Sequence, residues 1–79
     1  MSLTVFRERG YRFFFFSREE ARPHIHVYSG DGEAKFWIEP DIELARYYGY
    51  SQNQLREIQN IVEEHRNVIR TEWREHFGD

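Results

Sequence analysis

Hydrophobic and polar residues follow two different repeats along this chain, and the change comes near residue 50. Before that point, apolar residues alternate with polar ones over short runs, which is the period of a β-strand. From Ser51 onward, apolar and histidine side chains recur every three or four positions, which is the period of a helix with one buried side. The members of this helical repeat are Leu55, Ile58, Ile61, Val62, His65, Ile69, Trp73, His76 and Phe77.

Turn signals divide the alternating part into strands, which we expect at residues 2–8, 11–17, 24–29 and 33–39. Gly10 separates the first two strands, and the run SGDGE separates the third from the fourth. Pro23 suits the start of the third strand, where its missing N–H group costs no hydrogen bond. Residues 42–48 are either a fifth short strand or a helical turn, and we favour the strand.

The helical part has a start signal and a stop signal. Ser51 followed by Gln54 is a capping box, and Gly78 suits a C-terminal stop. One helix over residues 51–77 would be about 40 Å long. Because this is long for a chain of 79 residues, we expect a bend near residues 65–67.

These elements predict an α+β fold made of a single domain over residues 1–79. It has two layers: an antiparallel sheet of four to five strands, and one long, bent C-terminal helix packed on one face. Trp73 is expected in the core on the helix. Alternation along the strands directs the following residues toward the helix: Tyr11, Phe13, Phe15, Ile25, Val27, Ala34, Phe36 and Ile38.

The same alternation leaves an aromatic, histidine-rich set on the face that the helix cannot cover. This predicted interaction face consists of Phe14, Phe16, His24, His26, Tyr28 and Trp37, together with Phe6. A solvent-facing sheet surface is normally polar, and monomers rarely expose an apolar patch of this kind. Either a second copy, another protein or a ligand covers it, or residues 17–22 or the chain ends fold across it. We favour an intermolecular contact.

His24 and His26 are the sharpest candidates for chemistry, because alternate strand positions place both rings on one face. Such a pair can bind zinc or iron if further ligands join, and Glu39 by parity or Glu19 and Glu20 from the preceding loop are available. Paired histidines without a metal are more common, so no cofactor is expected. The pair can also act as general acid and base, with Arg22 or Arg12 holding a phosphate, as a metal-independent ribonuclease requires.

The helix carries a ridge of positive charge at Arg66, Arg70 and Arg74. Like charges four residues apart repel, so acidic partners are expected from Glu39, Asp41 and Glu43. His65 and His76 are expected to be partly buried, with their polar atoms satisfied.

Composition narrows the functional classes. The net charge of -3 weighs against a nucleic-acid partner, which is not favoured. The chain has no cysteine, which rules out disulfides and thiolate zinc sites. No apolar stretch reaches the roughly 18 residues of a membrane span, and the first residues lack the apolar core of a signal peptide. We therefore expect a cytoplasmic protein that does not bind membranes.

Three stretches together resemble a known family. PHIHV at residues 23–27, AKFWIEP at residues 34–40 and LREIQNIVEEHRNVIRTEWREHFG at residues 55–78 are similar to the small bacterial domain of unknown function 4160. The resemblance implies a short, free-standing bacterial protein, often encoded beside another small protein in toxin–antitoxin-like pairs, with no established activity. We expect an interaction module that docks a protein partner or itself. The alternative is a small enzyme, a ribonuclease-type toxin or a metal-dependent hydrolase, that uses His24 and His26.

Overall fold

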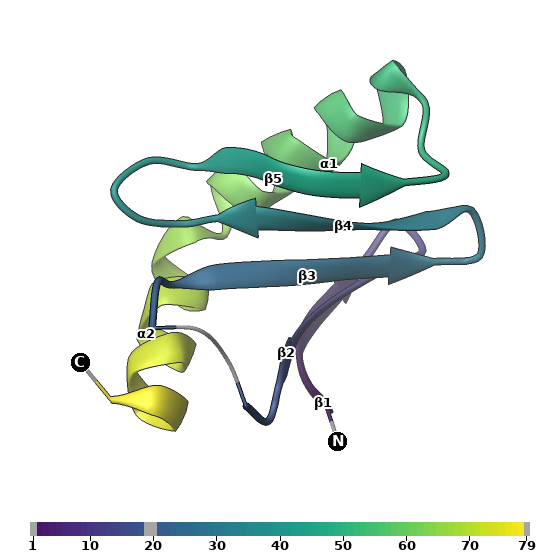
Figure 1. Ribbon diagram of the computed structural model, residues 1–79. Helices are drawn as coiled ribbons and strands as arrows, with labels where there is room; N and C mark the ends of the chain where they lie inside the picture. The colour runs from purple at the N-terminus through teal and green to yellow at the C-terminus, as the bar shows by residue number, and fades with distance from the viewer. Residues whose placement is uncertain (1, 19–20, 79) are drawn as a thin grey trace.

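The computed structural model describes residues 2–18 and 21–78, which form a five-stranded sheet followed by two helices. The elements are β1 (Ser2–Glu8), β2 (Tyr11–Phe16), β3 (His24–Ser29), β4 (Gly32–Trp37), β5 (Glu43–Tyr48), α1 (Gln52–Glu64) and α2 (Arg66–Phe77). All neighbouring strands are antiparallel and the sheet order follows the chain, β1-β2-β3-β4-β5. Both helices lie on one face of the sheet (Figure 1). The α+β class is therefore confirmed, and residues 43–48 form a strand.

The sheet is not continuous along its whole length. β2 and β3 pair only from Arg12–Tyr28 to Phe14–His26, and beyond that point the two strands diverge (Figure 1). The indole ring of Trp73 in α2 lies near both sides of the resulting gap, with ring centroids 5.3 Å from Phe15 and 5.1 Å from His24. Helix α2 therefore packs against the sheet at the place where the hydrogen bonding between β2 and β3 ends.

The core lies between the sheet and the two helices, and the alternation predicted it correctly. All eight strand residues assigned to the helix side are buried, and Phe13, Phe15, Ile25, Val27, Phe36 and Ile38 have no exposed surface. Trp73 is buried as expected, at 5% exposure. Helix α1 begins at the predicted capping box: the Gln54 N–H donates to the Ser51 side chain, and the Gln54 side chain accepts from the Ser51 N–H.

The prediction of one long helix was wrong, because the chain forms two helices with a break between them at His65. The break falls within the stretch where a bend was expected. The His65 N–H contacts the carbonyl oxygens of both Ile61 and Val62, at 3.1 and 3.2 Å, and Nδ1 of the same residue lies 2.9 Å from the Ile61 oxygen. A side chain that competes for a carbonyl of the helical ladder bends the helix at that point. The imidazole also stacks on Phe6, with centroids 4.2 Å apart.

The expectation that Phe6 belongs to the uncovered face was also wrong. The pairing of β1 with β2 shifts between Thr4–Phe14 and Phe6–Phe13, which makes Val5 the extra residue of a β-bulge. A bulge reverses the alternation beyond it. Phe6 therefore turns to the helix side, where its ring stacks on Phe13 at 4.4 Å.

Two glycines allow the β3–β4 turn to pack against the end of β5. A Cβ atom at Gly32 would lie 2.1 Å from the Tyr48 carbonyl oxygen, and one at Gly49 would lie 2.3 Å from the Asp31 carbonyl oxygen. Gly49 also has a φ of +87°, which disfavours any side chain. The Tyr50 hydroxyl completes this contact by donating to the Gly32 carbonyl at 2.9 Å. The end of β5 is thus held in place by backbone-to-backbone packing.

Candidate functional site

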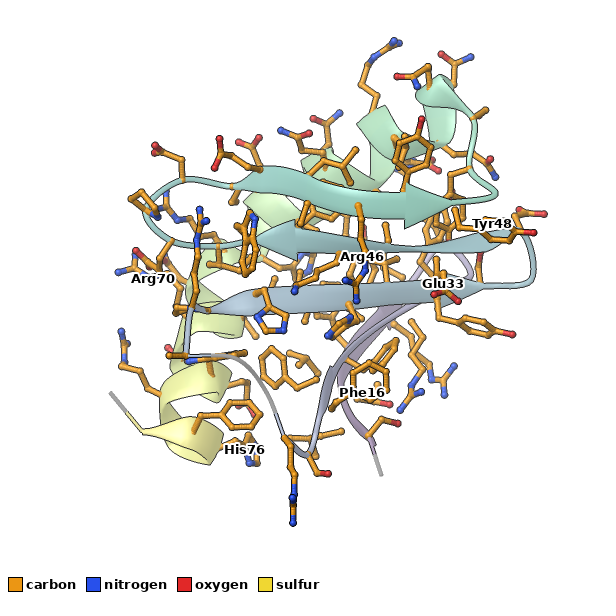
Figure 2. The ribbon with its side chains drawn as sticks, in the orientation of Figure 1. Phe16, Glu33, Arg46, Tyr48, Arg70 and His76 are labelled. Carbon is orange, nitrogen blue, oxygen red and sulfur yellow. The ribbon has the colours of Figure 1, made fainter. Side chains whose placement is uncertain are left out.

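The side of the sheet turned away from both helices, here called the open face, carries the predicted interaction residues. Figure 2 views the molecule from this side. Alternate residues of β2, β3, β4 and β5 point to it: Phe14 pairs with His26, His26 with Lys35, and Lys35 with Arg46 across neighbouring strands. The open face is therefore one surface, and β1 contributes to it as well because Arg7 pairs with Arg12 and Thr4 with Phe14.

Three of the six predicted interaction residues form the floor of the open face rather than its surface. Phe14 and His26 are each 8% exposed, and His24 is fully buried. The rings of Phe14 and His26 stack at 5.5 Å, and the Arg12 guanidinium lies 4.5 Å from the Phe14 centroid. Arg12 is held there because it donates to Thr4 and Ser2 side chains at 2.7 Å. Neighbouring side chains thus cover Phe14 and His26, although no helix does.

His24 lies at the place where β2 and β3 diverge. Its Nδ1 lies 2.7 Å from the Arg22 carbonyl oxygen, and its ring contacts Trp73, Trp37 and His26 at centroid distances of 5.1, 5.6 and 5.0 Å. The ring therefore links the open face to α2. A side chain with no exposed surface cannot touch a substrate in this conformation.

One end of the open face is covered from within the chain. The Arg22 guanidinium lies 4.3 Å from the Trp37 ring centroid, and the Lys35 ammonium lies 4.4 Å from it. Arg22 also donates to the Glu39 carbonyl at 2.9 Å and pairs with Glu43 at 3.3 Å. Arg22, at the end of the 17–22 loop, therefore covers part of this face from within the chain, as the intramolecular alternative expected. Trp37 is left half-buried.

The other end of the open face contains a hollow of about 350 Å³. Its wall includes three well-exposed aromatic side chains: Phe16 at 46%, Tyr28 at 53% and Tyr48 at 76% exposure. His26, Lys35, Glu33 and Arg46 line it as well, and Figure 2 labels Phe16, Glu33, Arg46 and Tyr48 around it. This combination of apolar rings with a few charged groups is typical of a binding surface.

Sequence reasoning missed Arg46, Tyr48 and Glu33 as members of this surface. The pairs Glu33–Tyr48 and Lys35–Arg46 place them on the open face. The sequence does contain a signal, the two-residue spacing of Arg46 and Tyr48. It indicates a shared face only when the pairing of residues 43–48 with β4 is known. Between the pairs Lys35–Arg46 and Phe36–Leu44, Ala45 is an extra residue in β5. The resulting shift brings Glu43 to the open face, opposite Trp37.

The metal-ligand set proposed from the sequence is divided between two places. The Glu39 carboxylate forms an ion pair with Arg70 of α2, and Glu39 lines a separate depression with Pro23 and Trp73. Within residues 2–18 and 21–78, no three His, Asp or Glu side chains gather as a metal site requires. Glu19 and Glu20, the other candidate ligands, lie outside the described residues.

The charged ridge on α2 finds partners partly as expected. Arg70 pairs with Glu39, while Arg66 donates to the Pro40 carbonyl at 2.9 Å. Of the two helix histidines, His65 is partly buried as expected, with Nε2 3.4 Å from Glu8. The same expectation for His76 was wrong, because its side chain is exposed, with Nε2 3.4 Å from Glu72. These contacts join α2 to the sheet or stabilise its own surface.

A hydrogen-bonded group on the helix side shifts the pKa values of Tyr11 and Glu57. The Tyr11 hydroxyl donates to Glu57 at 3.0 Å, and Arg9 binds the other oxygen of the same carboxylate at 2.9 Å. Burial, with the Glu57 hydrogen bond, raises the pKa of Tyr11 to about 12. The hydrogen bonds from Arg9 and Tyr11 lower the pKa of Glu57. This group links the β1–β2 turn to α1 and is structural.

Comparisons with known proteins identify a family. A family model described as "Domain of unknown function (DUF4160)" matches residues 10–74, which confirms the resemblance seen in the sequence. No curated protein and no solved structure matches significantly. Neither helix in the described part of the chain has the length and apolar character needed to span a membrane.

Proposed function

This chain belongs to the DUF4160 family, and from that starting point we propose that it is a protein-interaction module that docks a partner through its open face. The observation that carries the proposal is the position of Phe16, Tyr28 and Tyr48. These exposed aromatic side chains line a hollow. The hollow lies on the face of the sheet that neither helix covers (Figure 1).

The residue types suit a protein contact. Tyrosine, tryptophan and arginine are enriched among the residues that contribute most to binding energy, and tyrosine offers large contact area at low entropic cost. The buried residues below the surface, including Phe14 and His26, form a packed floor for the hollow. A preorganised surface binds more tightly because less conformational freedom is lost on association.

The expected partner is a protein encoded close to this one, as in the two-gene, toxin–antitoxin-like arrangement that the family resemblance suggests. A second copy of the chain is the other occupant that the proposal allows. Both would bury the exposed aromatic side chains, and they differ in whether the complex forms from the purified protein alone.

The test uses two surface variants as baits to capture the partner from the cells that encode the protein. Phe16→Ser/Tyr48→Ser removes two exposed rings from the open face. Val68→Ser removes an apolar side chain of α2 that is also half-exposed, and serves as the matched control. Circular dichroism and thermal melting establish that both variants are folded.

We expect the wild type and Val68→Ser to retain the same specific partner, or the same dimer, and Phe16→Ser/Tyr48→Ser to lose it. If the folded open-face variant retains the partner as well as the wild type does, the open face is not the docking surface.

A second candidate, a small enzyme, has one observation in its favour: His26 lines the hollow together with Lys35 and Arg46. Such a group could supply an imidazole and cations to a phosphodiester. The buried position of His24 argues against a two-histidine mechanism in this conformation. Ribonuclease activity that is present in the wild type and absent from a folded His26→Gln protein would favour the enzyme over the interaction module.

A further inference from the structure

The open face differs in charge from the chain as a whole. Among the residues that the structure describes, the face carries five cationic side chains, Arg7, Arg12, Arg22, Lys35 and Arg46, and two acidic ones, Glu33 and Glu43. The whole chain has a net charge of -3. The surface that the proposed function assigns to a partner is therefore locally positive.

Two of these cations are already held by the protein itself. Arg12 is fixed by hydrogen bonds to Thr4 and Ser2, and Arg22 by Glu39 and Glu43. Both also lie over aromatic rings. They therefore support the open face and contribute positive potential, but their donors are largely used.

Arg46 is in a different situation. Its side chain is exposed at the hollow, and it has no ion-pair partner among residues 2–18 and 21–78. It lies directly opposite Lys35 on the neighbouring strand, and Lys35 is only 6% exposed. Arg46 is therefore more accessible to an anionic group than Lys35 is.

We propose that the hollow binds an acidic side chain from a segment of a partner protein, with the carboxylate on the Arg46 guanidinium and neighbouring apolar groups against Phe16, Tyr28 and Tyr48. This inference rests on the proposed function and specifies its partner. Arginine binds carboxylates with a planar pair of donors, which gives direction as well as affinity. A hollow of about 350 Å³ holds one or two side chains rather than a folded domain.

A protein segment fits better than a nucleic acid. Glu33 lines the same hollow, and Glu43 lies on the same face beside Arg22. A phosphate backbone places a charge at every nucleotide and would meet both carboxylates, whereas a single acidic side chain needs only Arg46. The exposed tyrosines can then donate hydrogen bonds from their hydroxyl groups at the rim.

The experiment selects ligands from random peptides, so the partner need not be identified first. A displayed library of random dodecapeptides is selected on the immobilised wild-type protein and depleted on Arg46→Glu. We expect the retained peptides to combine aspartate or glutamate with an aromatic or leucine residue. A synthetic peptide of the selected sequence should bind Arg46→Glu about tenfold or more weakly than wild type, as expected when a charged hydrogen bond is lost. Arg46→Lys should show a smaller loss.

The matched control is Arg74→Glu, which makes the same charge reversal at an exposed arginine of α2. It should bind the peptide like the wild type. The inference is overturned if no peptide is enriched, if the enriched peptides lack acidic residues, or if Arg46→Glu and Arg74→Glu bind equally well. It is also overturned if a fluorescent oligonucleotide binds through Arg46 instead, or if the purified chain dimerises through this face.

The two proposals fail in different ways. If Phe16→Ser/Tyr48→Ser loses the native partner while Arg46→Glu retains it, the open face is the docking surface but the acidic ligand is wrong. If both variants retain the partner, the docking surface itself is wrong.

Discussion

The two faces of the sheet use the same strands but are closed in different ways. On the helix side, Phe13 and Phe15 are completely buried beneath α1 and α2. On the open face, Phe14 is covered only by neighbouring side chains, and Phe16 is 46% exposed. The run of four phenylalanines thus gives two rings to a finished core and two to a surface that is only partly closed. The comparison indicates that the helix side maintains the fold, while the open face leaves aromatic side chains exposed.

The largest effect should come from the side chain that closes the helix side. Trp73→Ala removes a buried indole that contacts both Phe15 and His24, and should lower the free energy of unfolding by about 3–5 kcal/mol. Chemical denaturation measures the loss. Val68→Ala, an exposed position on the same helix, should change stability by less than about 0.5 kcal/mol. Equal effects at the two positions would contradict the packing of α2 described here.

Adjacent phenylalanines test the two faces directly. Phe15→Ala should cost about 3–5 kcal/mol of stability because the ring is fully buried against Trp73 and Phe77. Phe16→Ala should cost about 1 kcal/mol, since half of that ring already contacts water. Thermal or urea unfolding of the two variants gives the difference. A loss at Phe16 as large as that at Phe15 would show that the open face is part of the core.

A smaller but still clear loss is expected where the end of β5 is held against the β3–β4 turn. Gly49→Ala places a methyl group 2.3 Å from the Asp31 carbonyl oxygen and forces a side chain into a left-handed backbone conformation. The cost should exceed about 2 kcal/mol. Gly30→Ala is the control, because its Cβ would meet open space. If both variants melt together, this contact does not position Tyr48.

The smallest effect concerns pH and lies on the helix side. The pKa of Tyr11 is raised to about 12, above its unfolded value near 10. The folded state therefore favours the neutral phenol, so this contribution to stability is complete below pH 10 and is lost as pH rises toward 12. Tyr11→Phe should remove most of that alkaline loss in the pH dependence of unfolding. A small part should remain, because burial also raises the pKa of Tyr50. An unchanged slope in Tyr11→Phe would contradict this assignment.

The sequence allowed the layers and the core to be predicted because local alternation determines which way a strand residue points. It worked for Phe13 and Val27, which pair with each other, and for Phe15 and Ile25, which pair with residues of β1 and β4. It failed at Phe6, because the bulge at Val5 arises from the fit between two strands and leaves no mark on the pattern. The helix break at His65 was expected only as a bend, since the competition for the Ile61 carbonyl depends on the imidazole orientation.

The candidate site was harder to predict, because parity gives a direction and not an exposure. Phe14 and His26 point to the open face as expected, but Arg12 and neighbouring rings bury them. The residues that border the hollow include Arg46 and Tyr48, which become visible only when β5 is paired with β4. The exposure of residues on a surface assembled from several strands depends on the strand register and on the way in which extended side chains cover their neighbours. Local periodicity predicts neither.

The central claim, that the open face contacts a partner protein, can be tested by crosslinking in the cells that encode the chain. The photoreactive amino acid p-benzoylphenylalanine is placed either at Tyr48, on the rim of the hollow, or at Val68, on α2. We predict one discrete covalent adduct from position 48 after illumination and none from position 68. Adducts from position 68 alone, or no adduct from position 48 in a folded and well-expressed protein, would contradict the claim.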